Sequence, residues 1–149
     1  MMMSEYLLER WYGEPGELQQ WAAKMADEIG GELGNEMYFH ALARVTCYET
    51  HNMFNEMGLD YERAIAGGES ILRKYPQNYQ SSNNQVVNFL ARFAALKGDR
   101  ERGILFFTDV GNAWTRWAWR DQAHFDTWNE WARMAARISK FGNTLDARR

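Results

Sequence analysis

The sequence predicts an all-α protein of about six helices, arranged as antiparallel hairpins in one domain that spans residues 1–149. Apolar residues recur at intervals of three and four along most of the chain, which is the spacing of one helix face. No stretch alternates apolar and polar residues for long, so strands are not expected. Only two prolines occur, Pro15 and Pro76, and long helices are therefore permitted almost everywhere. The short connections favour antiparallel packing of neighbouring helices.

The first two helices are predicted from apolar spacing and from glycines. Glu17–Ile29 carries one apolar stripe, and Gly30 and Gly31 are expected to end that helix, because a helix end often needs a left-handed residue. A second helix is expected from Asn35 to about Met57. Its segment MYFHALARVTCY is almost entirely apolar or aromatic, so we expect this helix to be central and contacted on two sides.

The remaining helices are predicted from capping residues and corners. Asp60 is a good N-cap for a helix that ends before Pro76. Gly98-Asp99 makes a second corner, at which Asp99 is the N-cap of the next helix. The four expected helices are Tyr61–Tyr75, Asn83–Lys97, Arg100 to about Trp114, and Asp121 to about Lys140.

Composition indicates a globular protein that works in a reducing compartment. Hydrophobic residues make up 46% of the chain and charged residues 25%, which is not a disordered composition. Cys47 is the single cysteine and cannot form an internal disulfide. The N-terminal segment lacks the basic and apolar regions of a signal peptide, and no apolar run approaches the ~20 residues of a membrane span. We therefore expect a cytoplasmic protein without a membrane partner.

Charge is unevenly distributed along the chain, whose net charge is −3. Residues 1–60 hold 11 acidic and three basic side chains, whereas residues 61–149 hold nine acidic and 14 basic side chains. Two interpretations remain open. The two halves of one domain attract each other, or an acidic face of the N-terminal half steers a basic partner toward the protein.

A weak repeat links the two predicted corners. GLDYERAIAGGESILRKYP and ALKGDRERGILFF place Asp60 and Asp99 at corners 39 residues apart, a length typical of helical hairpins. Ala64 and Gly103 supply small residues where antiparallel helices approach. These hairpins resemble tetratricopeptide repeats. The residues that match the pattern are Tyr48, Asp60, Tyr61, Ala64, Pro76, Leu90, Ala91, Gly98, Asp99 and Phe107, whereas His51 and Asn52 depart from it.

The resemblance implies a right-handed helical array closed by a C-terminal capping helix. A wider pattern over roughly residues 10–132, from RWYGEPG to the tryptophan-rich end, is similar to an uncharacterised bacterial domain family with such helices. That family has no established chemistry. The resemblance therefore implies scaffolding or partner binding, because helical repeats present extended surfaces.

The residue types of known catalytic and metal sites do not form a convincing pattern. Cys47 and His51 share a face of the predicted second helix, but two ligands do not make a zinc site. His40 lies about 16 Å along the axis from His51, and His124 is the one remaining histidine. Nothing around Cys47 resembles a nucleophile motif. We expect no catalytic residue, metal or cofactor, and keep an enzyme based on Cys47 and His51 as the alternative.

Other ligands are disfavoured by the same reading. Glu28, Glu32 and Glu36 recur at spacings of four, but glycines interrupt the helix, and a solvated acidic corner is the simpler interpretation. The glycines of GGELG lack the lysine and hydroxyl residue of a phosphate loop. The negative net charge disfavours nucleic acid, since phosphate contacts dominate that affinity.

The segment AWTRWAWRD, residues 113–121, is the most unusual feature. Trp114 and Trp117 share a helix face, and Trp119 lies about 200° from Trp117 around a helix. We expect a hinge before the last helix, with Trp114 and Trp117 sealing the junction against Trp128 and Trp131. Trp119 is then either tucked into the bend or exposed.

The predicted function is that of a non-catalytic module that binds another protein, since tryptophan, tyrosine and arginine are common interface anchors. A toxin-neutralising protein of the immunity type and a scaffold are two forms of it. Self-association into a homo-oligomer stays open. The candidate partner-binding residues are Trp119, Arg116, Arg120, Tyr79, Glu32 and Glu36.

Overall fold

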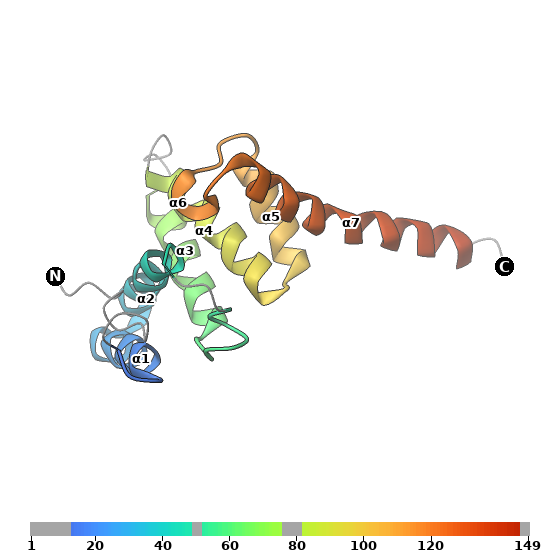
Figure 1. The fold of residues 1–149 in the computed structure, drawn as a ribbon. Coiled ribbons are helices and arrows are strands. Elements are labelled where there is room, and N and C mark those ends of the chain that lie inside the picture. The colour runs from blue at the N-terminus through green and yellow to red at the C-terminus, as the bar shows by residue number, and fades with distance from the viewer. Residues whose placement is uncertain (1–12, 49–51, 76–81, 147–149) are drawn as a thin grey trace.

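A computed structural model describes the backbone of residues 13–48, 52–75 and 82–146, and the side chains of residues 13–48, 52–75 and 84–134. Within these residues the chain forms seven helices and no strand, which confirms the predicted all-α class (Figure 1). The helices are α1 (Glu17–Ile29), α2 (Gly31–Thr46), α3 (Tyr61–Lys74), α4 (Ser82–Lys97), α5 (Arg100–Val110), α6 (Arg116–Trp119) and α7 (Gln122–Asp146). None of the helices in this part of the chain combines the length and the apolar character that crossing a bilayer requires.

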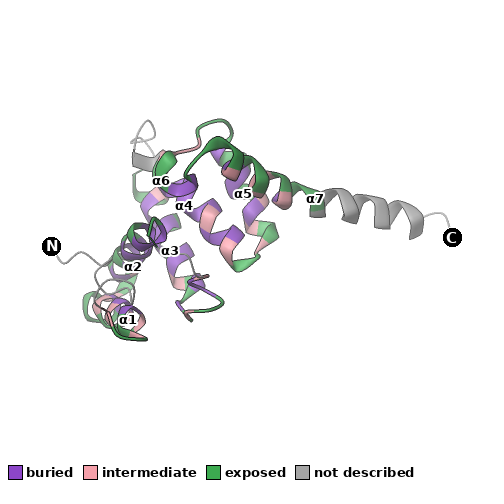
Figure 2. Ribbon diagram, viewed as in Figure 1, coloured by how far each residue is buried: buried purple, intermediate pink, exposed green. Residues whose placement is uncertain are grey.

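The helices succeed one another in space in the order of the sequence, from α1 and α2 at one end to α5 and α7 at the other (Figure 1). The tightest contacts join α2 to α3 and α4 to α5, and α3 against α4 links these two pairs. Buried residues concentrate on α2, α3, α4 and α5 (Figure 2). The short α6 contacts α4 and α7, so it closes the end of the array beside α4.

The predicted second helix is too long, because α2 ends at Thr46 and not near Met57. The Oγ1 atom of Thr46 donates a hydrogen bond to the Leu42 carbonyl at 2.6 Å. Farther on, Oδ1 of Asn52 accepts hydrogen bonds from the amides of Phe54 at 3.2 Å and Asn55 at 3.1 Å. Such local bonds compete with helical ones and favour a turn. Asn52 Nδ2 also donates to the Leu96 carbonyl, which fixes this turn against the end of α4.

Three other helix limits differ from the prediction, and one of them is the end of the last helix, which is Asp146 and not about Lys140. The second helix begins at Gly31, directly after Gly30, and not at Asn35. The fifth helix ends at Val110, because Gly111 adopts a φ of 54° and its amide donates to the Phe107 carbonyl at 3.1 Å. The following residues form α6 as a separate short helix, which raises the count over the described residues from the expected six to seven.

Both predicted N-caps are confirmed at equivalent corners. Asp60 Oδ1 accepts a hydrogen bond from the Arg63 amide at 3.0 Å, and Asp99 Oδ1 accepts one from the Arg102 amide at 3.1 Å. The repeat therefore extends further than the corner aspartates: D-x-E-R at residues 60–63 matches D-x-E-R at residues 99–102.

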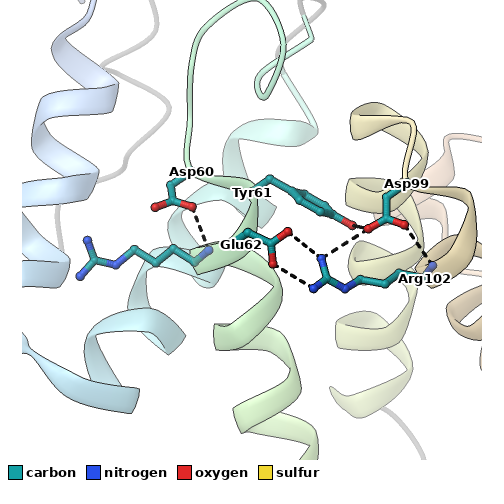
Figure 3. Close-up of polar contacts among 6 residues, drawn as sticks. Asp60, Tyr61, Glu62, Asp99 and Arg102 are labelled. Atoms are coloured by element: carbon teal, nitrogen blue, oxygen red, sulfur yellow. Dashed lines mark hydrogen bonds and ion pairs between the residues drawn. The ribbon is translucent and has the colours of Figure 1, made fainter.

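The second corner connects the two hairpins through side chains (Figure 3). The Tyr61 hydroxyl donates to Asp99 Oδ2 at 2.9 Å. The Arg102 guanidinium binds both carboxylate oxygens of Glu62, at 2.8 and 2.9 Å. Burial and the bond to Asp99 raise the pKa of Tyr61, so the hydroxyl keeps the proton that it donates. These contacts fix the start of α5 against the start of α3.

Glycines bring the backbones of neighbouring helices close together. A Cβ atom at Gly67 of α3 would lie 2.0 Å from the Asn35 carbonyl oxygen of α2. One at Gly34 of α2 would lie 2.3 Å from the Ala26 carbonyl oxygen of α1. Both distances are far shorter than any contact between a methyl group and an oxygen, so only glycine fits at either crossing. The predicted small residue at Gly103 is less tightly enclosed, since its nearest neighbour, Trp131, is 3.6 Å away.

Candidate functional site

An open groove of about 900 Å³ lies between α2, the end of α3, the start of α4 and α6. We call it the α2–α6 groove. Residues in or next to α2, α3, α4 and α6 line it. Most of the lining side chains are apolar, among them Met37, Phe39, Ala43, Ile71, Val86 and Phe89. The groove therefore offers a binding surface that water solvates poorly.

Three large aromatic side chains stand at the groove with much of their surface in water. Trp117 of α6 is 66% exposed, and Tyr48 and Tyr75 are exposed as well. Tyr48 follows α2 and Tyr75 follows α3. Met37 of α2 is a fourth exposed apolar residue in the lining. Side chains of this kind that gather around one concave surface are typical of a docking site.

Four polar side chains also line the groove: His40, Arg44, Cys47 and Gln85. Partial removal from water lowers the pKa of His40, and the charge of Glu36 counteracts that effect. The Sγ atom of Cys47 donates a weak hydrogen bond to the Trp117 carbonyl at 3.2 Å, so the thiol lies beside α6. No aspartate or glutamate occurs among the described residues that line the groove.

Trp119 is fully buried, with no exposed surface, and it anchors α6 from below. Its indole Nε1 donates to Oδ1 of Asn88 at 2.8 Å. The indole ring packs against Phe107 and Phe125, with ring centroids 5.3 and 5.4 Å away. Trp117 and Trp119 lie about 200° apart around a helix, so the burial of Trp119 directs Trp117 toward the solvent.

Asn88 holds the whole segment that leads into α6. It is itself fully buried on α4, and its Nδ2 donates to the carbonyls of Asn84 at 2.6 Å and Ala113 at 2.9 Å. Besides the Trp119 indole, Oδ1 accepts the Thr115 amide at 3.2 Å. All four hydrogen-bonding positions of the amide are therefore used. The sequence signal that points to Asn88 is an asparagine within the apolar run VVNFLARF.

The expectation for the tryptophan cluster is thus wrong in its assignment of faces. Trp117, expected to seal the junction, is exposed, and Trp114 is half-buried. Trp128 and Trp131 do not meet Trp117. They pack on each other with centroids 5.5 Å apart, and Trp131 lies beside α5 at Gly103. Of the two positions expected for Trp119, the structure shows the one inside the bend, so its buried side chain does not form part of the protein surface.

The predicted acidic residues Glu32 and Glu36 are engaged in ion pairs with α3. Lys74 Nζ lies 2.6 Å from Glu36 Oε1 and 3.3 Å from Glu32 Oε2, and Arg73 also pairs with Glu32. Burial tends to raise the pKa of Glu36, but hydrogen bonds from Lys74 and Ser70 outweigh it and lower the pKa. Here the acidic first half and the basic second half attract each other within one domain.

The remaining predicted partner-binding residues have different locations. Arg116 and Arg120 are exposed at the two ends of α6, on either side of Trp117. Tyr79 lies outside the described residues. Met37, Tyr48 and Tyr75 were not predicted as partner-binding residues, although Met37 and Tyr48 begin and end the apolar segment MYFHALARVTCY.

The alternative of an enzyme based on Cys47 and His51 loses its geometric premise. α2 ends at Thr46, so it does not place these two residues on one helix face, and His51 lies outside the described residues. Within the described part of the chain, no three histidine, cysteine or carboxylate side chains form a group that could hold a metal ion.

The described part of the chain is an all-α array of helical hairpins with a groove at which large aromatic side chains are exposed. Comparison of the chain with known protein families, curated proteins and solved structures gave no match. The resemblance to tetratricopeptide repeats therefore stays a prediction.

Proposed function

We propose that this protein is a non-catalytic binding module that holds an apolar segment of another protein in the α2–α6 groove. The exposed Trp117, standing beside Tyr48 and Tyr75 at one groove, carries the proposal. Tryptophan and tyrosine dominate the binding energy of protein interfaces because each buries a large, rigid surface. Exposure of such an apolar surface to water is unfavourable, and a partner that covers it removes this apolar area from water.

The shape of the groove favours a segment of protein over a small molecule. Pockets for small ligands enclose most of the ligand within about 300–1,000 Å³. The α2–α6 groove is at the upper end of that range, at about 900 Å³, and is partly open to solvent, so it would leave much of a small ligand exposed. One or two turns of an amphipathic helix, with apolar side chains directed into the groove, match such a surface. A cytoplasmic toxin-neutralising protein and a scaffold are the two forms of this function that we propose.

The proposal is tested by the affinity for a partner purified from the source cell. Wild-type protein serves as bait, and the captured partner is then purified and titrated in a calorimeter. We expect Trp117→Ala to weaken binding about thirtyfold, because a central tryptophan contributes about 2 kcal/mol or more. Leu105→Ala removes an equally exposed apolar side chain from α5, outside the groove, and should leave the affinity unchanged.

Equal affinities of Trp117→Ala and wild type for the purified partner would contradict the proposal. Recovery of only a second copy of the chain would replace it by self-association, which sedimentation would then measure. Cys47→Ala addresses the enzymatic alternative. On our proposal this variant keeps its partner affinity and its cellular phenotype, and loss of both would favour chemistry at Cys47.

A further inference from the structure

Two sets of arginines in the described part of the chain differ in their partners. Arg63, Arg73 and Arg102 each form an ion pair with a carboxylate of a preceding helix. Arg116 and Arg120 have no carboxylate partner in the described part of the chain. Arg116 is the first residue of α6 and Arg120 directly follows the helix, and both are exposed. Two positive charges without an ion pair thus lie beside the most exposed aromatic residue of the groove, and the nearest carboxylate in the sequence is that of Asp121.

Arg92 of α4 adds to this charge from beneath. Its guanidinium carbon lies 5.6 Å from the centroid of the Trp119 ring, and its Nη1 lies 3.1 Å from Nε2 of His124. Its Nε is buried without a hydrogen-bond partner. Burial and the charge of Arg120 both lower the pKa of Arg92. An arginine in such surroundings is stabilised when an anion binds nearby.

The backbone fixes Arg120 in an unusual conformation. Its φ and ψ are 63° and −59°, and it is the one residue other than glycine with a positive φ within the described residues. The Asp121 amide donates to the Trp119 carbonyl at 2.7 Å across it, which closes a tight turn. Such a conformation costs about 1–3 kcal/mol and persists where the surrounding structure imposes it. The buried Trp119 imposes it here, so the Arg120 side chain starts from a fixed point.

This cationic group borders the α6 end of the groove, because Arg116 adjoins Trp117, the α6 residue that lines it. Cys47 lines the groove, contacts the Trp117 carbonyl, and lies near enough to Arg92 to interact with its charge. The described groove lining supplies no carboxylate of its own. A partner segment that fills the groove therefore meets an apolar surface bordered by arginines that form no ion pair within the described residues.

We infer that the partner segment carries a carboxylate side chain next to its apolar anchor, and that Arg92, Arg116 and Arg120 bind this carboxylate. The inference rests on the function proposed above and specifies its partner as an acidic amphipathic segment. The apolar face of the segment covers Trp117, and an aspartate or glutamate one turn away reaches the guanidinium groups. A requirement for an acidic residue at that position also gives specificity, because apolar segments without it would bind the groove less tightly.

The test uses random peptides of about twelve residues, which span about 18 Å as a helix, displayed on phage and selected on the immobilised protein. Selected peptides are synthesised, together with versions in which each Asp or Glu is replaced by Asn or Gln. We expect enrichment of apolar residues with an acidic residue at a constant spacing. Neutralising that acidic residue should weaken binding about threefold to tenfold, as for partly exposed ion pairs.

The protein is varied in parallel. Arg116→Gln, Arg120→Gln and the double variant should each reduce the preference for the acidic peptide, whereas Arg133→Gln, on the exposed surface of α7, should not. Raising the salt concentration from about 0.1 to about 1 M shortens the screening length from about 10 to about 3 Å. The higher salt concentration should weaken binding of the acidic peptide and leave binding of its neutral version nearly unchanged. Circular dichroism confirms the fold of each variant.

The outcomes separate the two proposals. Apolar peptides that require Trp117 but show no acidic preference would overturn the carboxylate inference and leave the proposed function intact. An acidic preference that survives in the double arginine variant would also overturn the inference. Peptides whose binding ignores Trp117→Ala would overturn both.

Discussion

Replacement of Asn88 by alanine is expected to destabilise the end of the array that presents Trp117. The change removes an amide that is fully buried and makes four hydrogen bonds. It leaves the buried indole N–H of Trp119 without an acceptor, which costs about 1–3 kcal/mol. The lost bonds to the Ala113 carbonyl and the Thr115 amide add about 0.5–1.5 kcal/mol each. Asn88→Ala should therefore lower the free energy of unfolding by about 2–6 kcal/mol.

The assay is equilibrium unfolding in urea, followed by circular dichroism and by tryptophan fluorescence. Asn112→Ala is the matched control, because Asn112 is exposed and a surface substitution of this kind changes stability by about 0.5 kcal/mol or less. Trp119→Phe removes the indole N–H, and a double-mutant cycle with Asn88→Ala should show a coupling energy of about 0.5–3 kcal/mol. A free energy of unfolding for Asn88→Ala within about 0.5 kcal/mol of wild type would refute the assigned role of Asn88.

Two further predictions address the packing of α3 and the protonation of His124. Gly67→Ala forces a methyl group to 2.0 Å from the Asn35 carbonyl oxygen and should lower the free energy of unfolding by at least about 2 kcal/mol. The control Gly103→Ala should be tolerated, because its neighbours are farther away. Equal effects of the two variants in thermal unfolding would contradict the close crossing of α2 and α3. Burial and neighbouring arginines lower the pKa of His124, whose Nδ1 lies 2.7 Å from the Trp119 carbonyl. The fold therefore favours the neutral ring, and this stabilisation is complete above about pH 6.5 and is lost as the pH falls through the lowered pKa. The stability advantage of wild type over His124→Asn should shrink between about pH 7 and about pH 5, and an advantage independent of pH would count against this assignment.

Much of the fold could be predicted because the signals that specify it are local. Helical spacing identified the main helices, and Asp60 and Asp99 cap α3 and α5 as expected. The end of α2 could not be predicted in the same way. Asn52 there bonds to the Leu96 carbonyl, a residue far along the chain, and such tertiary contacts leave no periodic signal.

The candidate site was predicted only in part for a similar reason. Helical spacing shows that Trp117 and Trp119 lie on different faces, but it does not say which face meets the core. Asn88 decides that question by bonding to the Trp119 indole from α4. Tyr48 and Tyr75 reach the groove because α2 and α3 lie side by side, which the sequence around either residue does not indicate.

The most direct test of the groove as a partner-binding surface is to block it at Cys47. Cys47 is the single cysteine of the chain, is exposed, and lines the α2–α6 groove. A bulky fluorescein maleimide attached there should abolish binding of the purified partner, while Cys47→Ala treated with the same reagent should bind as wild type does. Undiminished partner affinity of the fully labelled protein would contradict the account.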